Sequence, residues 1–320
     1  MKVGIIGAGS IAGTMAGTIR EMDCAQNYAV AARDYGRAAE FAQTYGFEKA
    51  YGSYEELVED AGVELVYIAT PHSHHYEHIK LCLNHGKHVL CEKSFTVNES
   101  QAREVLALAR EKKLLLTEAI WTRYMPMRKT LDSVLSSGVI GRPYMLTANL
   151  GYIISGKERI MRPELAGGAL LDVGIYPLNF ASMVFGDEVD SITGTAVMTE
   201  TGVDAQNSIT ITYKDGKMAA LCSSAMGLSD RRGIIYGDNG FIEVENINNC
   251  EGIRVYDRSR NMIASYDTPK QISGYEYEVE ACLRAIKEGA LECPEMPHEE
   301  TLRMMGWMDE LRRQWGLVYP

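Results

Sequence analysis

A glycine-rich segment near the N-terminus has the residue types and spacing needed to hold a pyrophosphate. The run Gly-Ala-Gly-Ser-Ile-Ala, which starts at Gly7, fits the pattern G-x-G-x-x-G/A. Gly7 permits a tight turn, Gly9 lets the backbone approach a phosphate, and Ala12 is small enough for a helix to pack on the preceding strand. Ser10 and Ile11 begin that helix, whose free amides and positive dipole end attract phosphate. We therefore expect these residues to bind a dinucleotide; the alternative is a purely structural turn.

Lys93 has the chemistry to stabilise negative charge on a reacting oxygen. It follows Glu92 and a predicted strand over residues 88–91. Ligands of open α/β sheets bind at the carboxyl ends of the strands, where an ammonium can stabilise a developing alkoxide. We expect Glu92 to fix the lysine or to line the ribose site. The alternative for this pair is an ordinary surface salt bridge.

Asp172 and Tyr176 form a second candidate cluster. They are four residues apart in a predicted helix over residues 172–185, so they share one face of it. A phenol is a poor base at neutral pH, but a neighbouring ammonium makes its phenolate form accessible. We therefore predict that Tyr176 and Lys93 together move the proton that accompanies hydride transfer. The alternatives are a helix N-cap for Asp172 and a core phenol for Tyr176.

The choice of cofactor depends on the residue after the second predicted strand, at residues 28–32. An acidic side chain there selects NAD, but this chain has Arg33, and Arg37 follows one helical turn later. Two guanidinium groups suit a 2′-phosphate, so we favour NADP over NAD. The alternative is that Arg33 is merely solvated and that Asp34 takes the acidic role or caps the next helix.

Thr70 and Pro71 end a third predicted strand, at residues 63–69, and a histidine-rich tract follows them. We expect Thr70, Pro71, His72 and His75 to line the cofactor site near the nicotinamide. The tract also contains two histidines four residues apart, His74 and His78, which is the spacing of a helical metal pair. No nearby carboxylate or cysteine pattern completes a metal site, so we predict none.

The elements that position these residues alternate over the first 120 residues. Predicted strands at 2–6, 28–32, 63–69, 88–91 and 114–117 alternate with predicted helices, which indicates right-handed βαβ units and a doubly wound parallel sheet. We expect residues 1–120 to form an NAD(P)-binding domain of the Rossmann type.

In residues 121–320 most strand-like segments follow one another without helices between them. We expect this region to form an α+β domain with an open, mainly antiparallel sheet. Seven strand-like segments lie between residues 144 and 257, and turn signals at residues 214–216 and 238–240 match tight hairpins. Two amphipathic helices, at 275–287 and 299–315, follow.

Composition narrows the class of protein. The chain has 46% hydrophobic and 23% charged residues and a formal net charge of −11, which argues against a nucleic-acid or membrane partner. Its 7 cysteines lack C-x-x-C spacing, and we find neither signal-peptide features nor an apolar run long enough for a membrane span. We therefore expect a cytoplasmic protein.

The candidate motifs together resemble those of the glucose-fructose oxidoreductase/inositol dehydrogenase/rhizopine catabolism (Gfo/Idh/MocA) family. The resemblance runs nearly end to end and includes the glycine-rich turn, Glu92-Lys93, and the segment from Gly167-Gly168 to Tyr176. Within the family, segments such as residues 118–123 look like those of the dihydrodiol dehydrogenases and NADP-dependent D-xylose dehydrogenases.

The resemblance implies a Rossmann domain followed by a substrate-binding and dimerisation domain, whose sheet forms a homodimer interface. It implies catalysis by Lys93 and Tyr176, with Trp121 in the substrate pocket. We also expect Lys93, Trp121 and Arg123 to contact the cofactor. The alternatives are plain core packing for Trp121 and a surface charge for Arg123. Ser94 stands where relatives carry proline, which removes the rigidity that proline imposes after the lysine.

The sequence thus predicts an NADP-dependent oxidoreductase that acts on a small-molecule sugar or cyclic vicinal diol. We expect Lys93, Trp121, Asp172 and Tyr176 to contact the substrate. Two alternatives remain: a non-catalytic NADP-binding sensor on the same fold, and a reductase of anhydro- or keto-sugars.

Overall fold

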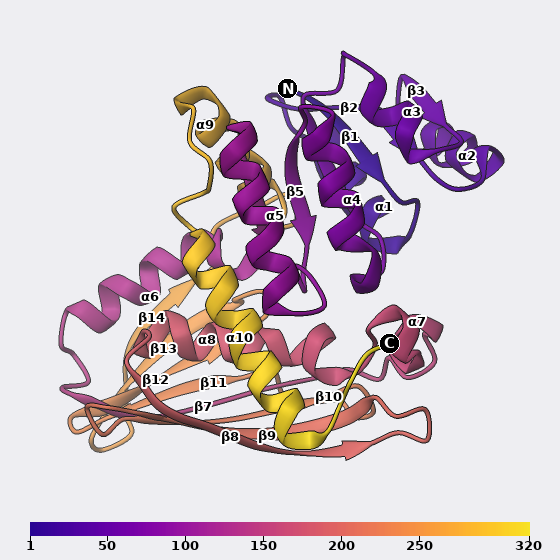
Figure 1. The fold of residues 1–320 in the computed structure, drawn as a ribbon. Helices are drawn as coiled ribbons and strands as arrows, with labels where there is room; N and C mark the ends of the chain where they lie inside the picture. Colours follow the sequence, from indigo (N-terminus) through magenta and orange to yellow (C-terminus); the bar gives the residue numbers. More distant parts are fainter. The chain divides into compact units, whose positions relative to one another are not determined.

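The computed structural model describes residues 1–320 and divides into two compact units (Figure 1). Unit 1 contains Met1–Tyr124 and Gln271–Met305, and unit 2 contains Met125–Lys270 and Gly306–Pro320. Residues 271–305, which sequence analysis assigned to the second domain, therefore pack with the nucleotide-binding fold. Each unit is built around its own sheet.

Unit 1 has a six-stranded sheet in the order β3-β2-β1-β4-β5-β6, and every neighbouring pair is parallel. The strands are β1 (Lys2–Ile6), β2 (Gln26–Ala31), β3 (Lys49–Tyr51), β4 (Leu65–Ile68), β5 (His88–Glu92) and β6 (Leu116–Ala119). The order reverses direction between β1 and β4, which is the doubly wound arrangement that sequence analysis predicted. Strands β1 and β4 are buried almost throughout, as strands with helices on both faces must be.

The helices of unit 1 connect these strands and begin at residues that favour helix starts. They are α1 (Ser10–Arg20), α2 (Tyr35–Tyr45), α3 (Tyr54–Glu59), α4 (His72–Asn84), α5 (Glu99–Lys112) and the 3₁₀ turn η1 (Trp121–Arg123). Ser53 and Glu56 form a capping box at α3, and Asn98 caps α5 by accepting a hydrogen bond from Gln101 N. Helix α9 (Glu276–Glu288) comes from the far end of the chain and packs against β5.

Unit 2 has an eight-stranded sheet in the order β14-β13-β12-β11-β7-β10-β9-β8. The strands are β7 (Pro143–Gly151), β8 (Val189–Met198), β9 (Asp204–Tyr213), β10 (Met218–Ser224), β11 (Gly233–Gly237), β12 (Gly240–Glu245), β13 (Gly252–Asp257) and β14 (Met262–Asp267). Only β7 and β10 pair in parallel, so the prediction of a mainly antiparallel sheet is confirmed. The predicted hairpins join β9 to β10 and β11 to β12, with Gly216 and Gly240 at positive φ.

The helices of unit 2 cover one face of this sheet. They are α6 (Pro126–Ser136), α7 (Glu158–Met161), the 3₁₀ turn η2 (Pro163–Leu165), the π-helical turn η3 (Leu170–Gly174) and α8 (Ile175–Phe185). Both η3 and α8 pack on β7 and β10. The segment Pro163–Phe185 is long and apolar enough to cross a membrane, but 89% of its most apolar 18-residue window is buried inside the protein. Helix α10 (His298–Trp315) runs from unit 1 into unit 2.

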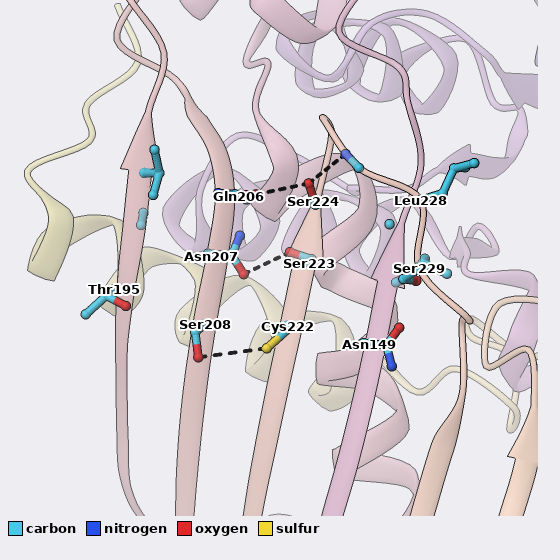
Figure 2. A pocket seen from close by; sticks show the side chains of 15 residues that line it. Asn149, Thr195, Gln206, Asn207, Ser208, Cys222, Ser223, Ser224, Leu228 and Ser229 are labelled. Carbon is cyan, nitrogen blue, oxygen red and sulfur yellow. Dashed lines mark hydrogen bonds between the residues drawn. The ribbon is translucent and has the colours of Figure 1, made fainter.

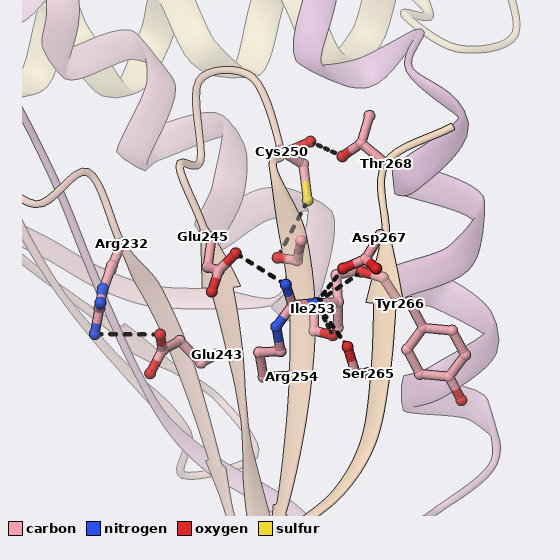
Figure 3. A network of polar contacts seen from close by, with 11 residues as sticks. Arg232, Glu243, Glu245, Cys250, Ile253, Arg254, Ser265, Tyr266, Asp267 and Thr268 are labelled. Atoms are coloured by element: carbon pink, nitrogen blue, oxygen red, sulfur yellow. Dashed lines mark hydrogen bonds and ion pairs between the residues drawn. The ribbon is translucent and has the colours of Figure 1, made fainter. Parts of the chain in front are cut away.

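Strand β14 forms one edge of the unit 2 sheet and was absent from the sequence prediction. Its polar anchor is Arg254 on β13, shown in Figure 3. The Arg254 guanidinium donates to Ser265 Oγ at 2.9 Å and to Tyr266 O at 3.2 Å, and it pairs with Glu245 on β12 at 3.3 Å. One arginine therefore ties the edge strand to two inner strands.

Candidate active site

The glycine-rich turn has the geometry that a pyrophosphate site requires. Gly7 has φ +104°, and a Cβ there would lie 2.9 Å from Ala69 O, so only glycine fits without strain. A Cβ at Gly9 would meet no atom within 4 Å, so open space borders the backbone at this point. No side chain caps α1, which leaves its N-terminal turn available to an anion. These residues therefore fit a dinucleotide.

Two arginines follow β2, where the adenosine ribose would be selected: Arg33 lies in the turn after the strand, and Arg37 lies in the first turn of α2. The Arg37 guanidinium donates to Ala8 O at 2.9 Å and so lies against the glycine-rich turn. Asp34 accepts a hydrogen bond from Arg37 N at 2.8 Å and is the N-cap of α2. The capping role that sequence analysis left open for Asp34 is therefore confirmed. This hydrogen bond occupies one of the two carboxylate oxygens of Asp34.

Arg33 is exposed and lies near a group of aromatic side chains. Burial, followed by the charge of Arg33, lowers the pKa of His74. Burial and the neighbouring histidines and Arg33 lower the pKa of His78 to about 4. The ring of Tyr54 meets the ring of His78 edge-on at 4.6 Å. The histidines are thus neutral at pH 7, and the positive charge in this group comes from Arg33 and Arg37.

The loop that carries Lys93 is held by buried side chains rather than by proline. The peptide between Lys93 and Ser94 is cis. His75, which is fully buried, lies 2.9 Å from Ser94 O through Nδ1 and 2.8 Å from Thr70 O through Nε2. It therefore joins the two strand ends at which sequence analysis expected the cofactor. Its burial lowers the pKa of His75 to about 4, so one ring nitrogen donates at neutral pH.

Two carboxylates complete the support of this loop. Glu92 is 7% exposed, accepts a hydrogen bond from the Tyr67 hydroxyl, and accepts another from Lys93 N at 3.2 Å. Glu118 on β6 accepts from Phe95 N at 3.1 Å, and burial raises the pKa of Glu118 to about 7. Because Glu92 is buried, it is not a surface salt-bridge partner. Ser94 is compatible with an ordered lysine loop because neighbouring strands fix the loop.

A third carboxylate, Glu278 on α9, faces the same region and was missed by sequence analysis. Both of its oxygens are buried without a hydrogen-bond partner. Burial, followed by the charge of Glu92, raises the pKa of Glu278 well above its ordinary value. Burial therefore favours the protonated form of Glu278, while the Tyr67 hydroxyl and Lys93 N donate to Glu92.

Trp121 has an aromatic partner that sequence analysis also missed. The ring of Tyr275 stacks on the indole of Trp121, with centroids 4.2 Å apart and planes inclined by 20°. Arg123, predicted beside the cofactor, is buried and pairs with Glu300 at 2.7 Å, so it is not a surface charge. In the sequence, Tyr275 stands at the start of the predicted helix over residues 275–287 and directly after a glycine. In the structure it directly precedes α9, and Gly274 has φ +101°.

In unit 2, Asp172 and Tyr176 lie on the continuous helical segment formed by η3 and α8. Asp172 is inside the π-helical turn and not at a helix N-cap, so that alternative is wrong. Its carboxylate pairs with Arg159 on α7 at 2.8 Å. Tyr176 is 7% exposed and directly follows the π-helical turn, with Pro177 next to it. π-Helical turns often occur at functional sites.

A separate pocket of about 530 Å³ lies in unit 2 at strands β7 to β10 (Figure 2). Its polar lining includes Gln206, Ser208 and Ser224. None of the predicted site residues lines it.

Comparison with known proteins identifies the family. Residues 1–120 match the oxidoreductase family with an NAD-binding Rossmann fold, and residues 129–243 match the GFO/IDH/MocA C-terminal domain. The trans-1,2-dihydrobenzene-1,2-diol dehydrogenase of Xenopus tropicalis is 34% identical over 327 residues, covering 100% of this chain and 99% of that protein. The human protein of the same name is 35% identical over 329 residues, covering 100% and 98%.

Solved structures share the fold. The 3-ketoreductase KijD10 from Actinomadura kijaniata, in complex with NADP and TDP-benzene, superposes with a TM-score of 0.91 at 24% identity, over 98% of both chains. An aldose-aldose oxidoreductase from Caulobacter crescentus gives a TM-score of 0.88 at 18% identity, over 98% of this chain and 97% of that one. The chain is therefore an NAD(P)-dependent dehydrogenase that belongs to the Gfo/Idh/MocA oxidoreductase family.

Proposed function

We propose that this protein is an NADP-dependent dehydrogenase of a sugar or a cyclic vicinal diol. The observation that carries the proposal is the position of Lys93 directly after β5, at the carboxyl edge of the nucleotide-binding sheet, on a loop fixed by His75, Glu92 and Glu118. Relatives named as diol dehydrogenases support the substrate class. The preference for NADP rests on the guanidinium groups of Arg33 and Arg37, because Asp34 caps α2.

In the oxidising direction, Tyr176 takes the proton of the substrate hydroxyl as a phenolate. Lys93 stabilises the negative charge on the phenolate and on the substrate oxygen, and Asp172 orients Tyr176. Bound NADP supplies the hydride acceptor. In the reducing direction the same tyrosine donates its proton. Trp121 offers an apolar face to the substrate ring, and Glu92 keeps the lysine loop in place.

The remaining cofactor contacts are assigned by their place at the strand ends. Gly7, Gly9, Ser10, Ile11 and Ala12 hold the pyrophosphate, and Thr70, Pro71, His72 and His75 line the nicotinamide half, with Arg123 at its border. A cytoplasmic location and a homodimer formed through the open face of the unit 2 sheet complete the proposal. The location is supported by the 7 cysteines, which lack the spacing of a disulfide framework.

The decisive experiment is an absorbance screen at 340 nm with NADP(H) and NAD(H) over pentoses, hexoses, inositols and trans-diols. We expect turnover with NADP and at least one of these substrates. Binding of NADP without turnover of any substrate in either direction would instead identify a non-catalytic sensor. Keto- and anhydro-sugars are tested with NADPH in the same assay, and turnover of these compounds alone would identify a reductase and contradict the diol assignment.

A further inference from the structure

The first turn of the helical segment that carries Asp172 and Tyr176 is hydrogen-bonded to a buried carboxylate on strand β9. Asp204, the first residue of β9, is completely buried. Its Oδ2 accepts a hydrogen bond from Leu170 N at 2.8 Å and another from Asn207 Nδ2 at 2.9 Å. Asn207 is held in turn by the Ser223 hydroxyl, which donates to its Oδ1 at 2.8 Å (Figure 2). The Asp204 carboxylate therefore accepts the free Leu170 amide at the start of η3. No side-chain hydrogen bond caps this turn from its N-cap residue, Ala169.

The two glycines before this helix allow the close approach of the Asp204 carboxylate on one side and of α7 on the other. Gly168 has φ +107°, and a Cβ there would lie 2.3 Å from Asp204 Oδ1. A Cβ on Gly167 would lie 2.4 Å from Ile160 O. Neither position accepts a side chain without displacement of the backbone or of Asp204. The Gly167-Gly168 pair is thus explained by the close approach of this carboxylate and of α7.

The C-terminal tail supports the same turn. The Tyr319 hydroxyl donates to Gly167 O at 2.5 Å. Arg312 on α10 lies over the Tyr319 ring at 5.0 Å and is the cation that acts on Asp204. Burial raises the pKa of Asp204 to about 6, against the opposing effects of Asn207, Leu170 N and Arg312. Asp204 keeps an acceptor oxygen towards Leu170 N in either protonation state.

We infer that Asp204 is a positioning residue for the reaction: its buried oxygen anchors residues 167–170, and this anchor sets the register of the helical segment from which Asp172 and Tyr176 project. The inference rests on the proposed function for its catalytic consequence. The anchor needs an acceptor oxygen and not a charge, so asparagine should replace Asp204 and alanine should not. A displacement of about 1 Å at a catalytic group is enough to lower turnover by about 100-fold.

The test compares Asp204→Ala with Asp204→Asn, and uses Asp215→Ala, in the exposed β9–β10 turn, as the matched control. We expect Asp204→Ala to lower kcat by about 10- to 100-fold with an unchanged dissociation constant for NADPH. Asp204→Asn and Asp215→Ala should retain kcat within about 3-fold. Amide hydrogen exchange in residues 170–174 should accelerate by more than about 10-fold in Asp204→Ala only. If Asp204→Ala does not fold, Asn207→Ala removes a hydrogen bond that holds the Asp204 carboxylate in place. This variant should accelerate exchange in residues 170–174 and lower kcat by about 3-fold.

The two ideas fail in different ways. Unchanged exchange in Asp204→Ala, or in Asn207→Ala where that variant is used, overturns the anchor. Faster exchange with full turnover overturns the positioning role. Equal losses of kcat in Asp204→Asn and Asp204→Ala also overturn it, because they show that the charge matters rather than the acceptor. A wild-type protein that turns over none of the screened substrates overturns the proposed function, and the exchange measurement then decides the anchor alone.

Discussion

Tyr275 stacks on Trp121 with a centroid separation of 4.2 Å, although 154 positions separate the two residues in the chain. The loop before Tyr275 is fixed by Glu276, whose carboxylate accepts hydrogen bonds from the amides of Ile272, Ser273 and Gly274 at 2.7, 3.1 and 2.7 Å. Ser273 also bonds to Thr18 on α1 at 2.7 Å. The late segment of the chain thus completes an aromatic pair beside the nucleotide-binding sheet.

Replacing Tyr275 tests whether this pair binds substrate. We expect Tyr275→Ala to raise KM for the diol or sugar by about 3- to 10-fold, because a stacked aromatic pair contributes about 0.5–1.5 kcal/mol. Tyr275→Phe retains the ring and should retain KM. Trp121 fluorescence should change in the alanine variant, and NADPH affinity should not. Equal KM values in all three proteins would contradict a substrate role for the pair.

Tyr176 is expected to carry the proton in the reaction. Tyr176→Phe removes one oxygen from a ring that is 7% exposed, so packing is preserved. We expect kcat to fall by at least about 100-fold, the usual contribution of an acid–base group, with NADPH affinity unchanged. Lys93→Met should cause a similar loss. Steady-state kinetics and fluorescence titration with NADPH check both variants, and unchanged turnover in Tyr176→Phe would remove the proposed role.

The nucleotide-binding fold was predictable because its signals are local. Alternating apolar strands and helices, the turn at Gly7, and the caps at Asp34 and Ser53 all lie within short windows of sequence. Strand β3, with only 3 residues, and edge strand β14, where Arg254 of another strand supplies the polar contacts, have weak local patterns. Their existence depends on neighbours in the sheet, and sequence analysis therefore missed them.

The support of the candidate site was less predictable for the same reason. Lys93 and Tyr176 could be selected by residue type and context, but Glu118 and Glu278 act through tertiary burial. Asp204 caps a helix that begins 34 positions earlier in the chain, and no local capping pattern marks it. The partners of carboxylates on remote strands and helices are set by the assembled tertiary structure, so they could not be identified from local sequence.

Glu118 should make stability depend on pH. Burial raises the pKa of Glu118 from its ordinary 4.5 to about 7, so the folded protein holds this proton more tightly than the unfolded chain does. Protonated Glu118 therefore contributes fully to the free energy of unfolding below pH 4.5, and this contribution is lost as pH rises through 7. The shift in pKa corresponds to about 3 kcal/mol. We expect Glu118→Gln to flatten the fall in unfolding free energy between pH 5 and pH 8. Urea denaturation at each pH measures this, and Asp215→Asn is the control; equal slopes in Glu118→Gln and wild type would disprove the assignment.

The open face of the unit 2 sheet should mediate the proposed dimer. Met145 and Met218 pair across β7 and β10, and both are more than one-third exposed at 36% and 39%. A charge at either position would be buried without a partner in such an interface. We expect sedimentation velocity to show a dimer for wild type and a monomer, or a dissociation constant raised by more than about 100-fold, for Met218→Glu. Lys129→Glu, on α6 away from the sheet face, should remain dimeric; a wild-type monomer at all concentrations would contradict the proposal.

Arg33 should decide between the two cofactors. Its guanidinium is exposed at the end of β2, and the neighbouring Asp34 already accepts the amide of Arg37. A 2′-phosphate would therefore meet positive charge from Arg33 and Arg37, whereas a 2′-hydroxyl would find no free acidic partner in the expected place. We expect Arg33→Ala to raise KM for NADPH by about 10-fold or more and to leave KM for NADH within about 2-fold, because a charge-assisted hydrogen bond contributes about 1.5–3 kcal/mol. Arg20→Ala, at the exposed end of α1, should change neither value. An equal effect of Arg33→Ala on both cofactors would show that the residue supports the fold and does not read the phosphate.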